Sequence, residues 1–342
     1  MGFFNSKEDS FPGDTITALQ ALFLKGLDSR QKTRVLKFNA AKFLGMQRLF
    51  SVFLSPSRQC NLKCMHCYEL FPEREKMQDY MATAQAKEAM QKILRLHACI
   101  VVFCSGEFLL RPDALELVSY AKSLGLLPAI VTNGSTVSPE TLESLKKAGI
   151  FLMIFSLDSA ESKEHDSNRG MPGLFEKAVS GIKSSAALGL NTEIWSFAMK
   201  GEKNKLEKLE SLGQRLGVKR VFVFLPILSG RLFNSFEKNL SPKERNELRN
   251  RFNASDKLAV EFKKESGLCR GMGNLHVNIL PNGEVTPCPP VPYSYGNIWN
   301  EDIKEIHKKI EKDFKRFPYC TGQCMVNFPE YREKTTAKFL EL

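Results

Sequence analysis

The chain has 342 residues, of which 43% are hydrophobic and 25% are charged, and these values are typical of a globular protein. It is too long for one small core and fits one large α/β domain with an appendage. The formal net charge of +11 comes from lysines and arginines scattered through amphipathic stretches, so we expect solvated helix faces and no nucleic-acid partner.

The cellular compartment can be estimated from the start of the chain and from its cysteines. The first residues lack a basic segment followed by an apolar core, and no apolar run approaches the length of a membrane span. We therefore expect a reducing, cytoplasmic environment. Nine cysteines in such a compartment indicate metal or redox ligands rather than disulfides.

Two amphipathic stretches precede the first strand. An apolar pattern at helical spacing begins near Asp14 and ends near Leu27, and Asp14 or Thr15 can serve as its N-cap. A second, basic helix is expected over 29–44, with apolar residues such as Val35 and Phe38. We expect this arm to pack over one end of the barrel, and the alternative is a peripheral contact with a membrane surface or with the substrate.

From residue 49 onward, apolar runs alternate with amphipathic helical patterns. Near-continuous apolar strands between amphipathic helices predict a parallel sheet that is covered by helices. Six β/α units are too few for a closed eight-fold barrel, so the predicted fold is α/β, an open partial (β/α)6 barrel. The expected strands are 49–54, 98–104, 126–132, 151–157, 190–199 and 218–225, and the expected helices are 82–96, 113–124, 138–149, 173–188 and 203–216.

The C-terminal third departs from this alternation of strands and helices. A helix is expected over 241–264, followed by a Gly- and Pro-rich stretch over 267–297 and a helix over 300–315. Within that stretch, Asn282 and Gly283 between apolar flanks predict a tight hairpin. The expected domains are an N-terminal helical arm (1–48), the partial barrel (49–240), and a linker helix with a small cysteine-rich auxiliary-cluster domain (241–342).

Three cysteines directly after the first strand carry the strongest chemical signal. Cys60, Cys64 and Cys67 have three and two intervening residues, a spacing at which one loop can turn three thiolates toward one point. Three thiolates suit a [4Fe–4S] cluster and leave one iron without a protein ligand, where chemistry can occur. The alternative is a zinc loop that uses His66 as a fourth ligand.

The triplet after the first of six β/α units resembles the radical S-adenosylmethionine (SAM) superfamily, over about residues 50–230. The resemblance implies an enzyme in which the amino and carboxylate groups of SAM chelate the open iron. It implies that one electron, from a flavodoxin- or ferredoxin-type reductant, cleaves SAM to methionine and a 5′-deoxyadenosyl radical. That radical then abstracts a hydrogen atom from the substrate, while the protein supplies position and excludes water.

The resemblance also assigns SAM contacts at the ends of the first two strands. His66 occupies the usually aromatic position before the third cysteine and is expected near the adenine. Ser105, Gly106 and Glu107 resemble the family's Gly-Gly-Glu-Pro motif, which binds the SAM amino group. The sequence departs from that motif at Ser105, which replaces the first Gly, and at Phe108, which replaces Pro.

Further SAM contacts are implied at the ends of later strands. Asn133 lies in the turn after the third strand, and Ser156 begins a segment that resembles the family's Ser-Leu-Asp-Gly stretch. Arg169 is a candidate partner of the SAM carboxylate, because a guanidinium binds a carboxylate in a fork. Leu225 is expected to border the adenine through its backbone.

Four C-terminal cysteines form a second constellation: Cys269, Cys288, Cys320 and Cys324. Four thiolates suit a fully ligated [4Fe–4S] cluster, and a structural zinc site is the alternative. The region resembles a twitch domain, the shortened relative of the SPASM domain, which implies one auxiliary [4Fe–4S] cluster.

The substrate is not encoded in any motif. The resemblance to enzymes with such auxiliary regions implies a ribosomal peptide or a small natural product as substrate. A lipid or isoprenoid substrate is the alternative, because the arm is basic and rich in Phe and Leu. The competing functional class is a non-enzymatic iron–sulfur or zinc module, which needs only the cysteines.

Overall fold

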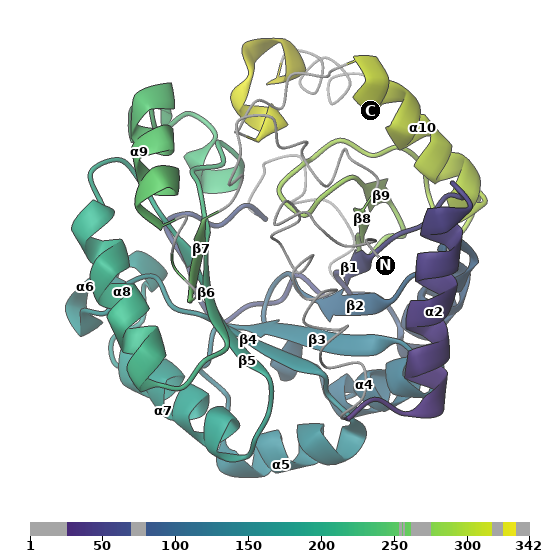
Figure 1. Cartoon of the computed structure of the whole chain (residues 1–342), viewed down its shortest axis with the longest axis horizontal. Coiled ribbons are helices and arrows are strands. Elements are labelled where there is room, and N and C mark those ends of the chain that lie inside the picture. Colours follow the sequence, from purple (N-terminus) through teal and green to yellow (C-terminus); the bar gives the residue numbers. More distant parts are fainter. Residues whose placement is uncertain are drawn as a thin grey trace, which may run out of the picture.

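The computed structural model describes residues 26–69, 80–252, 255, 257–260, 275–316 and 324–332. Its described strands form one open sheet in the order β7-β6-β5-β4-β3-β2-β1-β8-β9, parallel throughout except for the β8–β9 pair. Figure 1 shows the helices arranged around the outside of this curved sheet, as a partial barrel requires. The strands are β1 Ser51–Leu54, β2 Ile100–Phe103, β3 Leu127–Thr132, β4 Leu152–Ser156, β5 Thr192–Phe197, β6 Arg220–Phe224, β7 Leu258–Val260, β8 His276–Ile279 and β9 Val285–Thr286.

Helix α5 begins and ends at the signals that the sequence carries. For α5, the Ser138 hydroxyl accepts a hydrogen bond from the Thr141 N–H at 3.2 Å, and Gly149 ends the helix with a φ of 90°. None of the described helices is long and apolar enough to cross a membrane. The helices are α2 Ser29–Phe43, α3 Thr83–Ile93, α4 Ala114–Ser123, α5 Pro139–Ala148, α6 Ser162–Arg169, α7 Leu174–Ala187, α8 Lys203–Arg215, α9 Pro242–Phe252 and α10 Ile303–Arg316.

The sheet separates two apolar layers. Along β2, Val101 and Phe103 belong to the apolar layer under the covering helices, and the ring of Phe103 stacks on that of Phe108 with centroids 4.4 Å apart. Ile100 and Val102 alternate with them and pack on the inner face. Because both faces are covered, these strands read as continuous apolar runs in the sequence.

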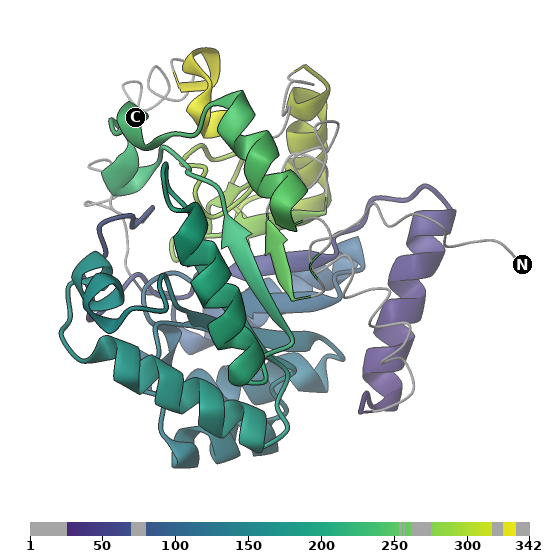
Figure 2. The same ribbon diagram turned by 60° about the vertical axis from the view of Figure 1, so that its left-hand side comes forward.

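Helix α2 covers the amino ends of the strands. Phe38 packs against Phe50, just before β1, with ring centroids 5.7 Å apart. The Gln31 side chain donates to the carbonyl of Leu126, just before β3, at 3.3 Å. The prediction that the basic arm packs over the barrel end is therefore confirmed for this helix, and Figure 2 shows α2 at one side of the molecule. The helix expected to begin near Asp14 falls almost entirely before residue 26, where the described part of the chain begins, so it lies outside the described residues.

The predicted helix over 241–264 is wrong in its second half. Helix α9 ends at Phe252, and the chain then enters β7, which pairs in parallel with β6. The Ser255 hydroxyl accepts hydrogen bonds from the N–H groups of Lys257 (3.1 Å) and Leu258 (2.8 Å). A local side-chain bond of this kind competes with helical backbone bonding, and the apolar residues that follow gain a strand partner instead.

The other edge of the sheet is extended by the C-terminal third. Strand β8 pairs in parallel with β1, with Ser51 opposite His276 and Leu54 opposite Ile279. The predicted hairpin is confirmed, since β8 and β9 pair antiparallel and Gly283 has a φ of 85°. β8 covers an edge of β1 that would otherwise present unpaired backbone groups. The boundary at residue 240 remains a prediction, and strands from both sides of it share this sheet.

Candidate functional site

The predicted site residues follow the carboxyl ends of neighbouring parallel strands. The cysteine loop follows β1, the Ser105–Glu107 turn follows β2, Asn133 follows β3, and Ser156 ends β4. Parallel strands bring these ends to one edge of the sheet. The structure therefore brings together residues that are distant in sequence: Asn133 lies 73 positions from Cys60, and Arg169 lies 105 positions from Cys64.

The cysteine loop is held by segments distant in sequence. The Met65 N–H donates to the Asn168 carbonyl at 2.8 Å. The Arg231 guanidinium donates to the carbonyls of Lys63 (2.6 Å) and Cys64 (2.9 Å). A Cβ added to Gly230 would lie 2.2 Å from the Cys67 carbonyl oxygen, so the chain after β6 approaches the loop more closely than any larger residue allows.

The three thiols lie in a setting that favours their protonated form. Burial raises the pKa of Cys60 and Cys64, and it raises that of Cys67 to about 11. Among the described residues, no group of three or more His, Cys, Asp or Glu is placed to hold a metal ion.

The donor set nevertheless fits a cluster. Three soft sulfurs from one loop match iron–sulfur ligation, and a bound metal replaces the thiol protons. Two donors are already directed at the sulfurs: Asn133 Nδ2 lies 4.0 Å from Cys60 Sγ, and Arg169 Nη1 lies 3.9 Å from Cys64 Sγ. Such donors stabilise the thiolate form once it is created.

The turn after β2 has an unusual backbone. Ser105 and Gly106 both have positive φ, at 66° and 59°. A Cβ on Gly106 would lie 2.2 Å from the Gln59 carbonyl oxygen, which also accepts from the Glu107 N–H at 2.8 Å. Glycine is therefore required at position 106, whereas at Ser105 a side chain is retained despite the strained conformation.

Glu107 links the loops after β2 and β3. Its carboxylate accepts hydrogen bonds from the Thr132 hydroxyl (2.9 Å), the Asn133 N–H (2.7 Å) and the Leu109 N–H (3.3 Å). The residue is 1% exposed, and burial raises its pKa despite these donors. These contacts fix the turn that carries Asn133. Binding of the SAM ammonium by Glu107 remains a prediction.

Arg169 is engaged by a partner that the sequence did not suggest. Its Nε and Nη2 donate to the two carboxylate oxygens of Asp158 at 2.8 and 2.7 Å, in a fork. Burial opposes both charges, but the pair overrides it, so the pKa of Asp158 is lowered and that of Arg169 is raised. The remaining nitrogen, Nη1, is the one directed at Cys64. Pairing of Arg169 with the SAM carboxylate remains a prediction.

His66 lies beside this pair. Its ring stacks on Phe197 of β5, with centroids 5.2 Å apart and planes 10° from parallel. Burial lowers its pKa to about 4, so the imidazole is neutral near pH 7. A flat neutral ring in this position suits packing against an adenine, which remains our prediction for His66.

The other two predicted contacts differ in their exposure. Ser156 is half-buried at the end of β4, whereas the Leu225 side chain is buried in the layer under the helices. A contact between Leu225 and the adenine would therefore have to come from its backbone, and that contact remains a prediction. The next carbonyl, of Pro226, accepts from the Asn327 amide at 2.8 Å, which ties this segment to the C-terminal region.

A buried polar cluster inside the rim was missed by the sequence analysis. The Ser55 hydroxyl, just after β1, lies 2.7 Å from the Ser105 hydroxyl, which donates to the Glu69 carboxylate at 2.7 Å. Glu69 also pairs with Arg58 at 3.6 Å. The inward alternation of Phe53 and Ser55 was the available signal, because a serine on a buried face needs partners.

The same cluster continues into the C-terminal region. Ser55 donates to the Asn278 side chain at 2.8 Å, and Asn278 donates to the Thr286 hydroxyl at 3.2 Å. Thr286 then donates to the carbonyl of Cys288 at 3.0 Å. A continuous series of polar contacts of hydrogen-bond length thus joins the loop of the first cysteine set to a cysteine of the second.

The second cysteine set is only partly described. Cys288 is half-buried and Cys324 is buried. Cys269 and Cys320 lie outside the described residues. Cys99 and Cys104 are buried, as expected for core thiols, and burial raises the pKa of each to about 12.

Comparison with protein families gives two matches. Residues 54–222 match the model described as the radical SAM superfamily, and residues 269–325 match an iron–sulfur cluster-binding domain called SPASM. The chain belongs to the radical SAM superfamily. It is therefore an enzyme of this family, which uses a [4Fe–4S] cluster and SAM, with auxiliary iron–sulfur binding in its SPASM region.

Relatives of this radical SAM protein have several activities. An AdoMet-dependent heme synthase of Methanosarcina barkeri is 27% identical over 284 residues, covering 74% of this chain and 80% of the relative. The subtilosin biosynthesis protein AlbA of Bacillus subtilis is 28% identical over 289 residues, covering 76% of this chain and 61% of the relative. The family is thus shared, whereas the named reactions differ.

Solved structures share the fold. SuiB of Streptococcus suis has a TM-score of 0.67 at 18% identity, covering 93% of this chain and 85% of that chain. The protein anSMEcpe with bound AdoMet has a TM-score of 0.62 at 17% identity, covering 86% and 92%. The predicted partial radical SAM barrel with an additional C-terminal region is confirmed.

Ser105 provides a test of the strained turn. Ser105→Ala keeps the positive φ and loses both buried hydroxyl bonds, so the free energy of unfolding should fall by about 2 kcal/mol. Ser105→Gly loses the same bonds but relieves the strain, so it should fall by only about 1 kcal/mol. Urea denaturation measures both. Ser144→Ala, at an exposed helix position, is the control and should change little. A glycine variant less stable than the alanine variant would contradict the strained conformation.

Arg169 provides a test of the buried ion pair. Arg169→Gln leaves the Asp158 carboxylate buried without its partner, and the free energy of unfolding at about pH 7 should fall by about 3–5 kcal/mol. The lowered pKa of Asp158 stabilises the wild type above about pH 4, and this contribution is lost as the pH falls. The difference between variant and wild type should therefore shrink in acid, as measured by denaturation across pH.

The matched control for that experiment is Arg251→Gln, which removes an exposed pair with Glu207. It should cost at most about 1 kcal/mol with little pH dependence. If Arg169→Gln behaved like this control, the Asp158 pair would not stabilise the site.

Proposed function

We propose that Cys60, Cys64 and Cys67 hold the cluster at which SAM is cleaved, and that the substrate reacts at this edge of the sheet. The observation that carries the proposal is the convergence of Asn133 on Cys60 and of Arg169 on Cys64, at 4.0 and 3.9 Å. When bound, the reduced cluster and SAM supply a 5′-deoxyadenosyl radical that takes a hydrogen atom from the substrate. An iron–sulfur electron carrier ordinarily ligates all four irons of a cube, whereas this loop offers three cysteines and leaves one iron open for SAM.

The chain's own residues hold SAM and orient it in this proposal. Neutral His66, stacked on Phe197, packs against the adenine. Arg169 keeps one nitrogen directed into the site while Asp158 fixes the other two, so the guanidinium is oriented before SAM binds. Preorganised donors of this kind need little rearrangement when the ligand arrives.

We further propose that Cys269, Cys288, Cys320 and Cys324 hold one auxiliary [4Fe–4S] cluster. All four lie within the SPASM match, and four thiolates complete the ligation of one cube. Such a cluster would supply an acceptor for the electron that the substrate radical loses. A flavodoxin- or ferredoxin-type protein supplies the electron to the first cluster.

The substrate that we propose is a small natural product of the haem-type tetrapyrrole class. The match to the heme synthase runs over 74% of this chain. Trp195 of β5 is half-buried on the inner face, and its ring meets that of Phe224 at 5.2 Å and 72°. Trp195 points to the same face as Phe197, about 7 Å along the strand. A flat conjugated macrocycle packs well on such aromatic faces.

A peptide is the second candidate substrate. The match to AlbA, which covers 76% of this chain, favours a peptide, because AlbA is named for the biosynthesis of the bacteriocin subtilosin. An aromatic wall also accommodates apolar peptide side chains. The two candidates therefore have to be separated by binding experiments.

Anaerobic reconstitution tests the two-cluster enzyme. The wild type should contain roughly eight irons per chain and form 5′-deoxyadenosine with SAM and dithionite. Cys64→Ala should retain roughly four irons and lose 5′-deoxyadenosine, because the open iron is lost with the first cluster. Cys99→Ala, which removes a core thiol, is the control and should keep both. Zinc in place of iron in the C-terminal site would overturn the auxiliary-cluster proposal.

Tryptophan fluorescence tests the substrate class, because the chain has only two tryptophans, at 195 and 299. In Trp299→Phe, iron coproporphyrin III should quench Trp195 saturably. Adding Trp195→Leu should weaken binding about tenfold, followed by Soret absorbance, because the aromatic platform is lost. Binding that is absent or insensitive to Trp195 would reject the tetrapyrrole and leave SAM cleavage untouched.

A further inference from the structure

Helix α2 is apolar on two faces. Its inner face packs on the barrel, while its outer face carries Leu36, Phe43 and Leu44, which are 58%, 84% and 65% exposed. Positions i, i+7 and i+8 lie on one side of a helix, so these side chains form a strip, and Met46 just beyond the helix is 44% exposed. An exposed strip of large apolar side chains marks an interaction surface rather than an ordinary solvated face.

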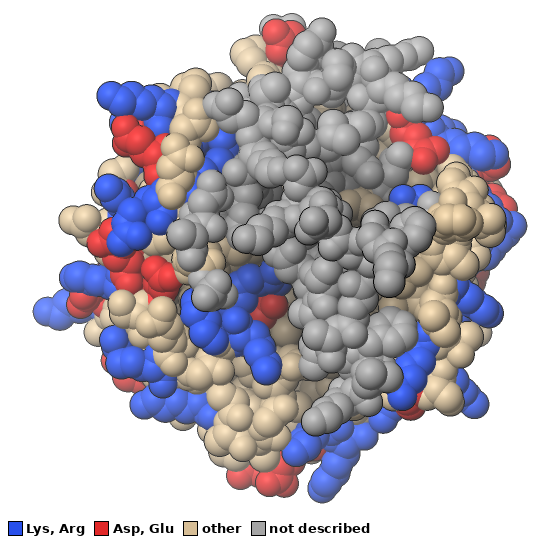
Figure 3. Space-filling view, viewed as in Figure 1, with Lys and Arg blue, Asp and Glu red and all other residues tan. Residues whose placement is uncertain are grey.

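The charged residues of α2 have one sign. Helix α2 contains five Lys or Arg and no Asp or Glu. Lys37 is exposed beside the apolar strip. Over α2, at the right of Figure 3, blue Lys and Arg atoms border tan surface. The surface therefore combines apolar side chains with positive charge.

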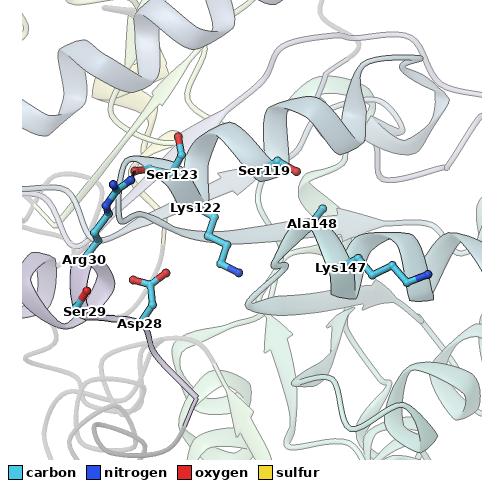
Figure 4. Close-up of a pocket in the computed structure, with 8 residues that line it drawn as sticks. All are labelled: Asp28, Ser29, Arg30, Ser119, Lys122, Ser123, Lys147 and Ala148. Carbon is cyan, nitrogen blue, oxygen red and sulfur yellow. Dashed lines mark hydrogen bonds between the residues drawn. The ribbon is translucent and has the colours of Figure 1, made fainter.

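The neighbouring helices extend the positive surface. A hollow of about 440 Å³ lies between α2, α4 and α5, and its lining includes Arg30, Lys122 and Lys147 with a single carboxylate, that of Asp28. Figure 4 shows the side chains of Lys122 and Lys147 beside this hollow. A second hollow, of about 370 Å³, is lined by Arg34 and Lys37 together with apolar residues of the strip. Basic side chains of α2, α4 and α5 thus line these two hollows, and those of the second hollow lie directly beside the strip.

We propose that this end of the barrel docks on the surface of an anionic lipid bilayer. The strip of Leu36, Phe43, Leu44 and Met46 enters the boundary between headgroups and acyl chains, and the surrounding Lys and Arg contact the headgroups. A helix that is apolar on one face and basic around it is the combination that binds anionic membranes. An acidic protein would also match the positive charge of the surrounding Lys and Arg. A strip of four apolar side chains, however, does not require a protein partner.

The placement of α2 decides which way the active site faces. Helix α2 covers the amino ends of the strands, through contacts such as Phe38 with Phe50. The cysteine loop follows the carboxyl end of β1, on the opposite edge of the sheet. The docked enzyme thus turns its catalytic edge away from the membrane, so docking does not require a lipid substrate. The inference is independent of the proposed function and fails or stands separately from it.

Vesicle co-sedimentation of the full chain tests this inference. Wild type should sediment with vesicles of phosphatidylglycerol and phosphatidylcholine and stay in solution with phosphatidylcholine alone. Binding should be largely lost at about 1 M salt, where the Debye length is about 3 Å. Phe43→Ser with Leu44→Ser should weaken binding at least about tenfold, because both side chains leave the apolar boundary. Lys37→Glu should weaken it as well, without changing the apolar strip.

Leu115→Ser is the matched control, since Leu115 is 42% exposed on α4, outside the strip. It should bind like the wild type, and circular dichroism should show that all variants are folded. Wild type that ignores anionic vesicles, or a double serine variant that still binds, would overturn the proposal. So would sedimentation velocity showing that the double serine change abolishes a dimer, because the strip would then join two copies of this chain.

Discussion

The structure of the site depends on the hydroxyl of Ser55, at the carboxyl end of β1. It is fully buried, lies 2.7 Å from the hydroxyl of Ser105, after β2, and donates to the side chain of Asn278, in β8. The parallel register sets this position, since Leu54 pairs with Phe103 on one neighbour and with Ile279 on the other. A buried hydroxyl that satisfies both neighbours fixes where the two flanking loops leave the sheet.

Around that anchor, the site is assembled from loops whose polar groups satisfy one another. Glu107 holds the turn of Asn133, and Asp158 holds the guanidinium of Arg169. Buried charges are costly unless they are paired, so each pair restrains the loops that carry it. The groups expected to meet SAM therefore already have defined orientations, which is the condition for precise positioning of a reactive radical.

The two edges of the barrel have different roles. Polar and sulfur-bearing side chains gather where the strands end, whereas α2 closes the edge where they begin with apolar packing inside and a basic apolar surface outside. Parallel sheets allow this separation because all strand ends of one kind meet at one edge. Surface contacts made through α2 can thus change without disturbing the chemistry at the other edge.

The sequence by itself determined the β/α alternation, the cysteine triplet, the α5 caps and the Asn282-Gly283 hairpin, because period, capping and turn chemistry act within a few residues. The helix over 241–264 was mispredicted because the Ser255 side-chain bonds and pairing with β6 outweighed local pattern. Only the tertiary structure placed β8 beside β1, and only the tertiary structure showed that Arg169 pairs with Asp158. Ser55 and Asn278 lie 223 positions apart, and no local pattern encodes which buried groups meet over such a separation.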